Sequence, residues 1–312
     1  MVPNDSVTAA DREAVFDLRP LSVHIGAEIV GLDLSKPLAS ETVAALRHAL
    51  CRWKVLFFRD QQLDHEGHIR FARHFGAPTP GHVVFGGESL HPEIYSVAKH
   101  RTALTGNPPV QRAWTDWHTD ITAAVNPPFA SILRGAVVPP YGGDTHWTNL
   151  AVAYQHLSPA LRGFLDGLRA VHRYSAPAGD EGAAAYRDKI RATDLAAEHP
   201  LVTVHPETSE RVLFVSPSFL ESIVGLTPRE SQGLLELLWE HAIRSEFTVR
   251  FKWEPGSLAF WDNRATAHLA PSDIFATDFE RQFYRVTLMG EVPVGTDGRL
   301  STLISGEPIK AQ

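Results

Sequence analysis

The chain has 312 residues, of which 44% are hydrophobic and 21% charged, and it carries a formal net charge of −7. This composition is typical of a globular protein with a sizeable core, and the length favours one large domain. The negative charge argues against nucleic acid as the main partner, because phosphate binding needs clustered Lys and Arg. A single cysteine excludes a disulfide framework and a thiolate metal cluster within the chain.

The N-terminal residues carry no basic segment followed by an apolar one, so no signal peptide is expected. No run of residues approaches the roughly 18 apolar positions of a membrane span. We therefore expect a cytoplasmic protein with no membrane partner.

The first part of the chain alternates short strands with two helices. Residues 21–34 alternate apolar and polar side chains around glycines, which predicts a bent hairpin. Residues 40–53 have helical spacing, with Ser40 as the predicted N-cap. A short buried strand over 54–60 and a second helix over 64–76 follow.

The later part of the chain places strand patterns on both sides of a helical middle. A strand is predicted over 129–138, helices over 149–168 and 227–242, a hairpin over 201–216, and a run of short strands over 247–292. This order predicts a mostly β domain, a double-stranded β-helix (jelly roll) with flanking and inserted helices. A doubly wound α/β fold is less favoured, because no strand, glycine-rich loop and helix follow one another.

Candidate metal ligands stand in the segment TDWHTDITAA. His118 and Asp120 are two residues apart in an extended-looking stretch without proline, so both side chains are expected on one face. His91 and His205 also precede a carboxylate by two positions, but a proline in each pair indicates a turn or an edge. About two such pairs are expected by chance, so context and not number singles out the first one. Taken alone, it also fits a surface pair or a hydrogen-bonded core histidine.

A third ligand and an anion clamp are available further along the chain. His268 lies in the strand-like run FWDNRATAHLA. Two histidines and one carboxylate leave one face of an octahedral iron open, as in non-haem Fe(II) oxygenases, and the open positions can take a bidentate 2-oxoacid. Arg281 and Arg285 are four residues apart on a predicted strand, which places both on one face. Because a guanidinium binds a carboxylate through two hydrogen bonds, the two arginines are candidates for holding two anions.

In this combination the sequence resembles the taurine dioxygenase (TauD/TfdA) family of Fe(II)/2-oxoglutarate-dependent dioxygenases. The matching segments follow in order along nearly the whole chain: IGAEIVGLDLSKPL (25–38), VLFFRDQ (55–61), FARHFGAP (71–78), WHTD (117–120), PPFASILRG (127–135), YGGDTHWTN (141–149), WDNRATAHLA (261–270) and RQFYRVTLMGEVP (281–293). The C-terminal segment further resembles the branch of the family that cleaves alkyl sulfates.

The resemblance implies a metal site and a co-substrate site. It implies that His118, Asp120 and His268 bind iron, and that Thr145 hydrogen-bonds the 2-oxoglutarate carboxylate that Arg281 clamps. The implied cofactors are Fe(II), 2-oxoglutarate and O2, with no catalytic residue beyond the metal site. The implied reaction is hydroxylation of an unactivated C–H bond of an anionic substrate through an Fe(IV)-oxo species, with release of succinate and CO2.

The substrate is the point at which the sequence departs from the taurine enzymes. Arg285 matches the arginine that grips the anionic group of the substrate, and His82 lies near a substrate-contacting histidine of the family. Trp114 replaces an asparagine that contacts taurine, which suits a bulkier or more apolar acid. An alkyl sulfate or sulfonate, or a larger carboxylate natural-product intermediate, is expected. Lid-like insertions are expected near 82–114 and 175–198, and the resemblance implies a homodimer or homotetramer.

Two other functions fit parts of the pattern. A His–Asp–His set also binds zinc, so a zinc-dependent hydrolase stays open, although it has no use for Thr145 and Arg281 as a pair. A non-catalytic jelly-roll protein could use the two arginines to bind an anion. Dependence on O2 and 2-oxoglutarate distinguishes the dioxygenase from both.

Overall fold

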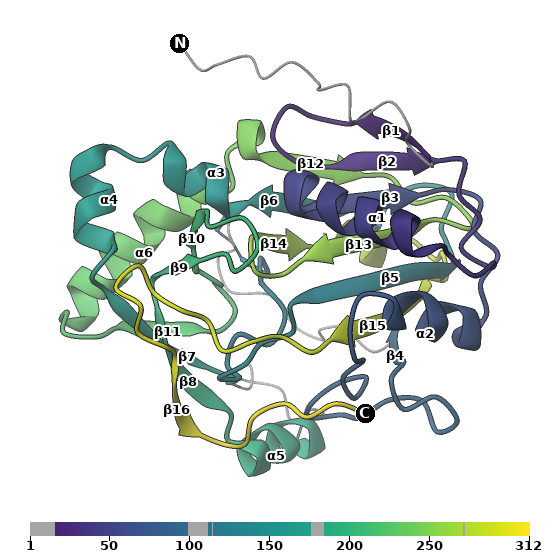
Figure 1. Cartoon of the computed structure of the whole chain (residues 1–312). Coiled ribbons are helices and arrows are strands. Elements are labelled where there is room, and N and C mark those ends of the chain that lie inside the picture. The colour runs from purple at the N-terminus through teal and green to yellow at the C-terminus, as the bar shows by residue number, and fades with distance from the viewer. Residues whose placement is uncertain (1–15, 99–111, 114, 176–183, 271) are drawn as a thin grey trace.

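Two β-sheets face each other, and helices cover their outer surfaces (Figure 1). The computed structural model describes residues 16–98, 112–113, 115–175, 184–270 and 272–312. Among the helices in these ranges, none is long and apolar enough to cross a bilayer.

The larger sheet has seven strands in the order β1-β2-β3-β13-β5-β15-β4. Neighbouring strands in this sheet are antiparallel, except that β2 and β3 are parallel. In spatial order the strands are Asp17–Pro20 (β1), Ala27–Val30 (β2), Val55–Phe58 (β3), Leu258–Asp262 (β13), Ala130–Val137 (β5), Gln282–Leu288 (β15) and Tyr95–Ala98 (β4).

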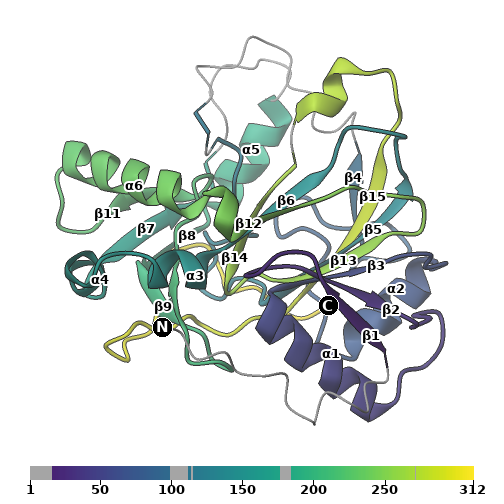
Figure 2. The same ribbon diagram turned by 90° about the horizontal axis from the view of Figure 1, so that it is seen from above.

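Both faces of this sheet are covered, so β3 and β13 carry continuous runs of apolar residues, VLFF and LAFW, rather than an alternating pattern. Helices α1 (Ser40–Trp53) and α2 (His65–Arg73) pack on the outer face, and the second sheet lies on the inner side (Figure 2). The side chains that face the helices include Leu56, Phe58, Leu258 and Phe260. Those that face the second sheet include Val55, Phe57, Ala259 and Trp261.

The smaller sheet has three antiparallel strands in the order β12-β6-β14. They are Thr248–Phe251 (β12), Thr145–Asn149 (β6) and Thr266–Leu269 (β14). Aromatic rings fill the space between the two sheets, and Phe57 stacks on Phe251 with ring centroids 4.0 Å apart. This aromatic layer holds the sheets in a fixed relation, so residues on their inner faces can form one site.

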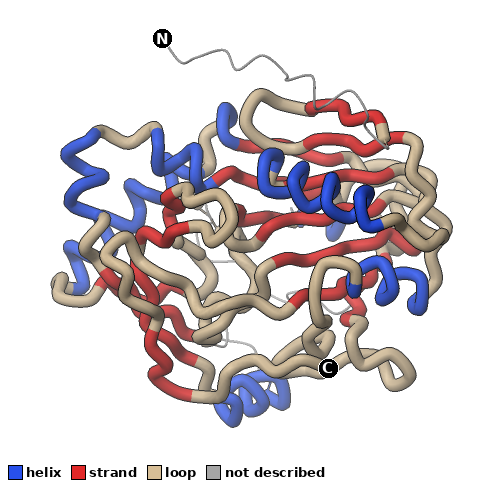
Figure 3. Tube along the Cα trace, in the orientation of Figure 1, coloured by secondary structure: helices blue, strands red, loops and turns tan. Residues whose placement is uncertain are grey.

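A second layer of structure covers the smaller sheet and one end of the sandwich (Figure 3). Its helices are Leu150–Gln155 (α3), Pro159–Leu165 (α4), Ala184–Thr193 (α5) and Pro228–Ala242 (α6), with 3-10 turns at Ser245–Phe247 (η4) and Ser272–Ala276 (η5). Its strands are the pair Val202–Val204 (β9) and Arg211–Leu213 (β10), and the sheet Leu220–Ile223 (β11), Arg169–Arg173 (β7), Ala196–Pro200 (β8) and Thr302–Ser305 (β16).

The predicted jelly-roll core with flanking helices is confirmed, whereas several predicted boundaries are wrong. The hairpin predicted over 21–34 is instead the pair β1 and β2. Ser40 is the first helical residue and not the N-cap, which is Ala39 without a side-chain cap. The second helix stops at Arg73 rather than at residue 76. The helix predicted over 149–168 is two helices, because Ser158 caps a new one that has proline in its first turn.

The two predicted lid-like insertions are only partly described. Residues 99–111, 114 and 176–183 lie outside the described residues. The described parts contain strand β4, at the edge of the larger sheet, helix α5 and most of strand β8. A lid function for either insertion stays a prediction.

Candidate metal centre and active site

The centre of the candidate site is a direct backbone pair between two histidines from remote parts of the chain. The His118 N–H donates to the His268 carbonyl over 2.9 Å, and the His268 N–H donates to the His118 carbonyl over 2.7 Å. This reciprocal exchange is an antiparallel β-bridge between His118 and His268, which lies in β14, and it brings the two backbones into register. The two imidazole centroids lie 4.2 Å apart as a result.

Asp120 completes a group of three possible metal ligands. One ligand atom each from His118, Asp120 and His268 lie within 4.8 Å of one another. The structure therefore brings together the three residues that the sequence singled out. The segment is less regular than expected, because only His118 pairs as a strand and the backbone turns left-handed at Ile121, with φ 48°.

The protonation of the two rings fits metal binding. His118 Nδ1 lies 2.9 Å from the Asp116 carbonyl, which can only accept, so Nδ1 carries the proton and Nε2 keeps its lone pair. His268 Nδ1 is buried without a hydrogen-bond partner in the described part of the chain. Burial above all, and then the nearby His118, lowers the pKa of His268 well below its usual value, which keeps the ring neutral. Two imidazoles and a carboxylate are a ligand set that fits Fe(II).

Asp120 is held on both carboxylate oxygens. Arg285 Nη1 donates to Oδ1 over 2.5 Å, and Ser131 Oγ donates to Oδ2 over 2.6 Å. Burial alone would raise the pKa of Asp120, but Arg285, the two histidines and the Ser131 hydrogen bond outweigh it, so the pKa falls below its usual range. The carboxylate is therefore ionised at neutral pH, as a metal ligand must be.

Three residues behind Asp120 were not singled out from the sequence. Asn263 Nδ2 donates to Ser131 Oγ over 2.8 Å, and Trp261 Nε1 donates to Asn263 Oδ1 over 2.9 Å. Asn263 and Trp261 belong to the WDN segment that begins the motif around His268, so their closeness in sequence to a candidate ligand was the available signal. Ser131 carried no such signal, since it is one serine in an apolar strand.

Arg281 is a buried cation beside an aromatic pair. It is 7% exposed, and its guanidinium carbon lies 4.0 Å from the centre of the Phe283 ring. Its Nε has no hydrogen-bond partner among the described residues. Burial lowers the pKa of Arg281 to about 10, against the opposing effect of Asp273, so it stays charged at neutral pH. Gly143, with φ 66°, leaves the space for it, because a Cβ there would meet Arg281 Nε at 3.0 Å.

Thr145 borders the same aromatic pair. Its Oγ1 accepts a 2.9 Å hydrogen bond from Trp253 Nε1, and Trp253 packs edge-on against Phe283 with ring centroids 4.7 Å apart. An indole nitrogen can only donate, so the Thr145 hydroxyl accepts there and keeps its own proton for another acceptor. Thr145 contacts Trp253, Arg281 contacts Phe283, and these two rings contact each other, so both donors border one aromatic pair.

His82 lies within the electrostatic reach of Arg285 and Asp120. Its Nδ1 accepts hydrogen bonds from the backbone N–H groups of Val84 and Phe85 over 3.1 and 3.3 Å, so a neutral ring carries its proton on Nε2. Burial first, and Arg285 second, lower the pKa of His82 to about 3, while Asp120 opposes the shift. The structure therefore brings His82 and Arg285 together. Trp114 lies outside the described residues.

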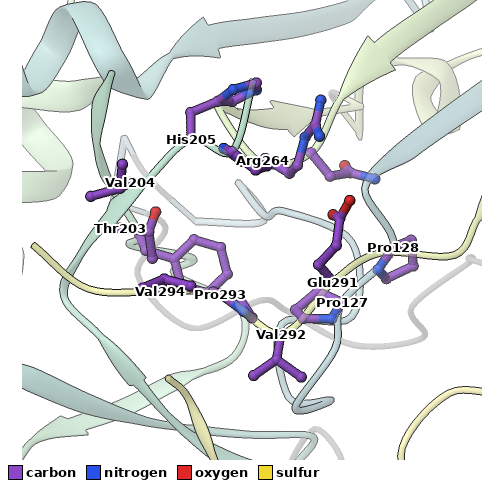
Figure 4. A pocket seen from close by; sticks show the side chains of 13 residues that line it. Pro127, Pro128, Thr203, Val204, His205, Arg264, Glu291, Val292, Pro293 and Val294 are labelled. Carbon is purple, nitrogen blue, oxygen red and sulfur yellow. The ribbon is translucent and has the colours of Figure 1, made fainter. Parts of the chain in front are cut away.

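A separate pocket has proline, valine and Glu291 side chains around it (Figure 4). Asn263 lines it, together with a mostly apolar wall of proline and valine side chains, and none of the three candidate ligands does. In Figure 4, Thr203 and Val204 lie on one side and Glu291 and Pro128 on the other. This pocket is distinct from the candidate metal site. Asn263 lines the pocket and is also hydrogen-bonded to Ser131, which donates to Asp120.

The sequence and the fold both match known proteins. The family model for taurine catabolism dioxygenases (TauD, TfdA family) matches residues 17–287. An alpha-ketoglutarate-dependent sulfate ester dioxygenase from Pseudomonas putida is 40% identical over 306 residues, which covers 96% of this chain and 97% of that protein. An alkylsulfatase from Acinetobacter baylyi is 37% identical over 291 residues, which covers 91% and 88%.

A crystal structure of a taurine dioxygenase from Burkholderia xenovorans is 61% identical, covers 94% of this chain and 96% of its own, and superposes with a TM-score of 0.83. The family match spans most of the chain, and the fold match spans nearly all of it. The chain belongs to the TauD/TfdA family of dioxygenases, near its sulfate ester branch.

Proposed function

We propose that the protein is an Fe(II)- and 2-oxoglutarate-dependent dioxygenase that hydroxylates alkyl sulfate esters at the carbon bearing the sulfate. The observation that carries the proposal is the meeting of His118, Asp120 and His268 within 4.8 Å, beside the half-buried Arg285. The names of the Pseudomonas and Acinetobacter relatives support a sulfate ester as the substrate class.

The metal would be held by His118, Asp120 and His268. When bound, ferrous iron and 2-oxoglutarate together activate O2 to an oxidant strong enough to hydroxylate a C–H bond, leaving succinate and CO2. The chain's part is to keep the His268 imidazole neutral, which burial does, and to keep the Asp120 carboxylate ionised, which Arg285 does. Their fixed backbone pairing supplies the pre-organisation that such a site needs.

The co-substrate would be held by Arg281 and Thr145. The guanidinium of Arg281 offers a fork of N–H donors, one of which has no partner within the described ranges. Thr145 adds a hydroxyl proton that Trp253 cannot use. Together they suit the distal carboxylate of a dicarboxylic acid, and not a neutral group.

The sulfate group would be held by Arg285 and His82. Arg285 Nε is buried and has no partner in the described part of the chain, while Nη1 is engaged with Asp120. His82 contributes an Nε2–H that its backbone contacts leave available. A cationic fork and a neutral N–H donor match an oxyanion with several acceptor oxygens. Hydroxylation next to the ester oxygen gives a hydroxyalkyl sulfate, which breaks its C–O bond to release an aldehyde and inorganic sulfate.

The test compares three anions of equal chain length: an alkyl sulfate, the alkyl sulfonate and the fatty carboxylate. With Fe(II), 2-oxoglutarate and O2, we expect the sulfate ester to give one sulfate per succinate formed, at a higher kcat/KM than the other two. Sulfate release without O2 or 2-oxoglutarate would instead indicate a metal-dependent hydrolase. Preference for the carboxylate would redirect the substrate proposal to natural-product acids.

Two further expectations belong with this proposal. We propose a cytoplasmic location and a homodimeric or homotetrameric state. Light scattering on the purified protein measures the latter, and a monomer at micromolar concentration would contradict it.

A further inference from the structure

We propose that Asn263 is a positioning residue, which fixes the direction of a hydrogen-bond chain that ends on the candidate metal ligand Asp120. The chain runs from Trp261 to Asn263, then to Ser131 and Asp120, over 2.9, 2.8 and 2.6 Å. This inference rests on the proposed function, because it assigns a role toward the metal that Asp120 would hold.

The chain can take only one direction. The Trp261 indole can donate but not accept, which assigns the facing atom of Asn263 as the amide oxygen. The amide nitrogen of Asn263 therefore faces Ser131 and donates to its oxygen. Because Ser131 Oγ has one proton, and Asp120 is an ionised acceptor, that proton goes to Asp120 Oδ2.

Two members of the hydrogen-bond chain lie in neighbouring strands of the larger sheet. Ser131 on β5 and Trp261 on β13 are direct partners across the larger sheet. Asn263 follows β13, and its own N–H donates to the Phe129 carbonyl over 2.8 Å. Trp261, Asn263 and Ser131 are each at most 2% exposed. Water does not compete at these positions, so the hydrogen bonds specify one orientation of the Asp120 carboxylate.

The carboxylate is thus held from two sides that have different functions. From the core, Ser131 holds Oδ2, and from the substrate side Arg285 holds Oδ1. Arg285 is shared with the proposed substrate anion, whereas Ser131 and Asn263 bond only within the protein. Partners of this kind behind a metal ligand commonly change metal affinity about 10–100-fold when removed.

The experiment measures the dissociation constant for Mn(II), an air-stable substitute for Fe(II), in the full-length protein with saturating 2-oxoglutarate. Ser131→Ala removes the donor to Asp120, and we expect Mn(II) affinity to fall about 10-fold or more. Ser131→Thr keeps a hydroxyl and should restore most of that affinity. Asn263→Leu keeps the branched shape without its hydrogen bonds, and it should weaken Mn(II) binding by a smaller factor. Leucine is preferable to alanine, because Asn263 lines the pocket of Figure 4 and truncation would enlarge it.

A double-mutant cycle separates positioning from general destabilisation. If Asn263 acts through Ser131, Asn263→Leu has no further effect on Mn(II) affinity once Ser131 is alanine. Asn126→Leu is the matched control, since Asn126 is a buried amide bonded to the backbone of Ile309 and not to Ser131. It should lower the melting temperature without changing Mn(II) affinity. A cobalt-substituted sample provides a second readout, because a reoriented carboxylate shifts the visible Co(II) absorption in Ser131→Ala and not in Asn126→Leu.

The outcomes separate this inference from the proposed function. Failure of the wild-type chain to bind Mn(II) would contradict the proposed metal site itself. Tight wild-type binding with unchanged affinity in folded Ser131→Ala would overturn the positioning role alone. Additive losses in the double variant would overturn the claim that Asn263 acts through Ser131.

Discussion

Arg285 Nη1 lies 2.5 Å from Asp120 Oδ1, and the two side chains are 11% and 2% exposed. One guanidinium therefore neutralises a candidate metal ligand through Nη1, while its Nε has no hydrogen-bond partner among the described residues. A buried charge of this kind needs a partner, because an unpaired one costs several kcal/mol. If Arg285 also holds the substrate anion, as proposed, substrate binding and the charge of the metal site are linked through this one residue.

Arg285→Gln should separate substrate binding from 2-oxoglutarate turnover. We expect kcat/KM for the sulfate ester to fall about 10–150-fold, which corresponds to a lost charged hydrogen bond of about 1.5–3 kcal/mol. Slow succinate formation without substrate should continue. Arg250→Gln is the control, because Arg250 also pairs with an aspartate but is 57% exposed. Equal loss of both activities would argue against a substrate role for Arg285.

Arg281→Gln should have the opposite pattern. The KM for 2-oxoglutarate is expected to rise about 10–150-fold, since the same type of charged contact is lost. Arg281→Lys keeps the charge without the fork and should give an intermediate KM. The KM for the sulfate ester should change little in either variant, measured at saturating 2-oxoglutarate. A rise in the ester KM alone would show that the two arginines had been assigned to the wrong anions.

Thr145→Val tests the donor role of the hydroxyl at nearly constant shape. We expect a rise of about 5–10-fold in the KM for 2-oxoglutarate, as for one neutral hydrogen bond of about 1 kcal/mol. The variant also leaves Trp253 Nε1 without its acceptor in a buried position, so stability should fall by about 1–3 kcal/mol. Trp253→Phe removes the same hydrogen bond but leaves the Thr145 hydroxyl in place. The KM of this variant for 2-oxoglutarate should therefore stay closer to the wild-type value than that of Thr145→Val.

The candidate site residues could be found from the sequence because they stand in local motifs. The contacts that hold these residues together in space could not be found in this way. His118 and Asp120 share one short motif, and Arg281 and Arg285 share another. Their meeting with His268 depends on a β-bridge between segments about half the chain apart; the ligand chemistry called for a third residue and the family resemblance supported His268, but no local pattern shows the bridge itself. Ser131 lies in the mostly apolar strand β5, and nothing in its sequence neighbours indicates that it donates to a carboxylate.

Element types were predictable, and element ends were not. Strands β3 and β13 are buried on both faces, so their continuous apolar runs were easily recognised. The end of α2 was misplaced because Gly76 resembled a C-cap, although the helix stops three residues earlier at Arg73. The first hairpin was misplaced because β1 has little apolar pattern and is mostly exposed, so its pairing with β2 left no signal in the sequence.

The stability of the protein should fall steeply as the pH drops from about 6.5 to 5. Burial lowers the pKa values of His68 and His82 to about 3 and of His199 to about 4, and that of His172 well below its usual value. Unfolded histidines bind protons below about pH 6.5, whereas these folded ones do not, so the unfolded state gains protons and stability decreases. Each group contributes at most about 1.4 kcal/mol per pH unit in that window.

His68→Gln isolates one of these groups. His68 Nε2 lies 3.2 Å from the Ile132 carbonyl, and a glutamine amide can make the same donation. Urea unfolding between pH 7.5 and 5 should therefore give a pH slope for the variant that is shallower by about 1.4 kcal/mol per pH unit. Above pH 7 its stability should differ from the wild type by a constant offset only. The same slope in both proteins would mean that His68 is protonated in the folded state, against the effect of its complete burial.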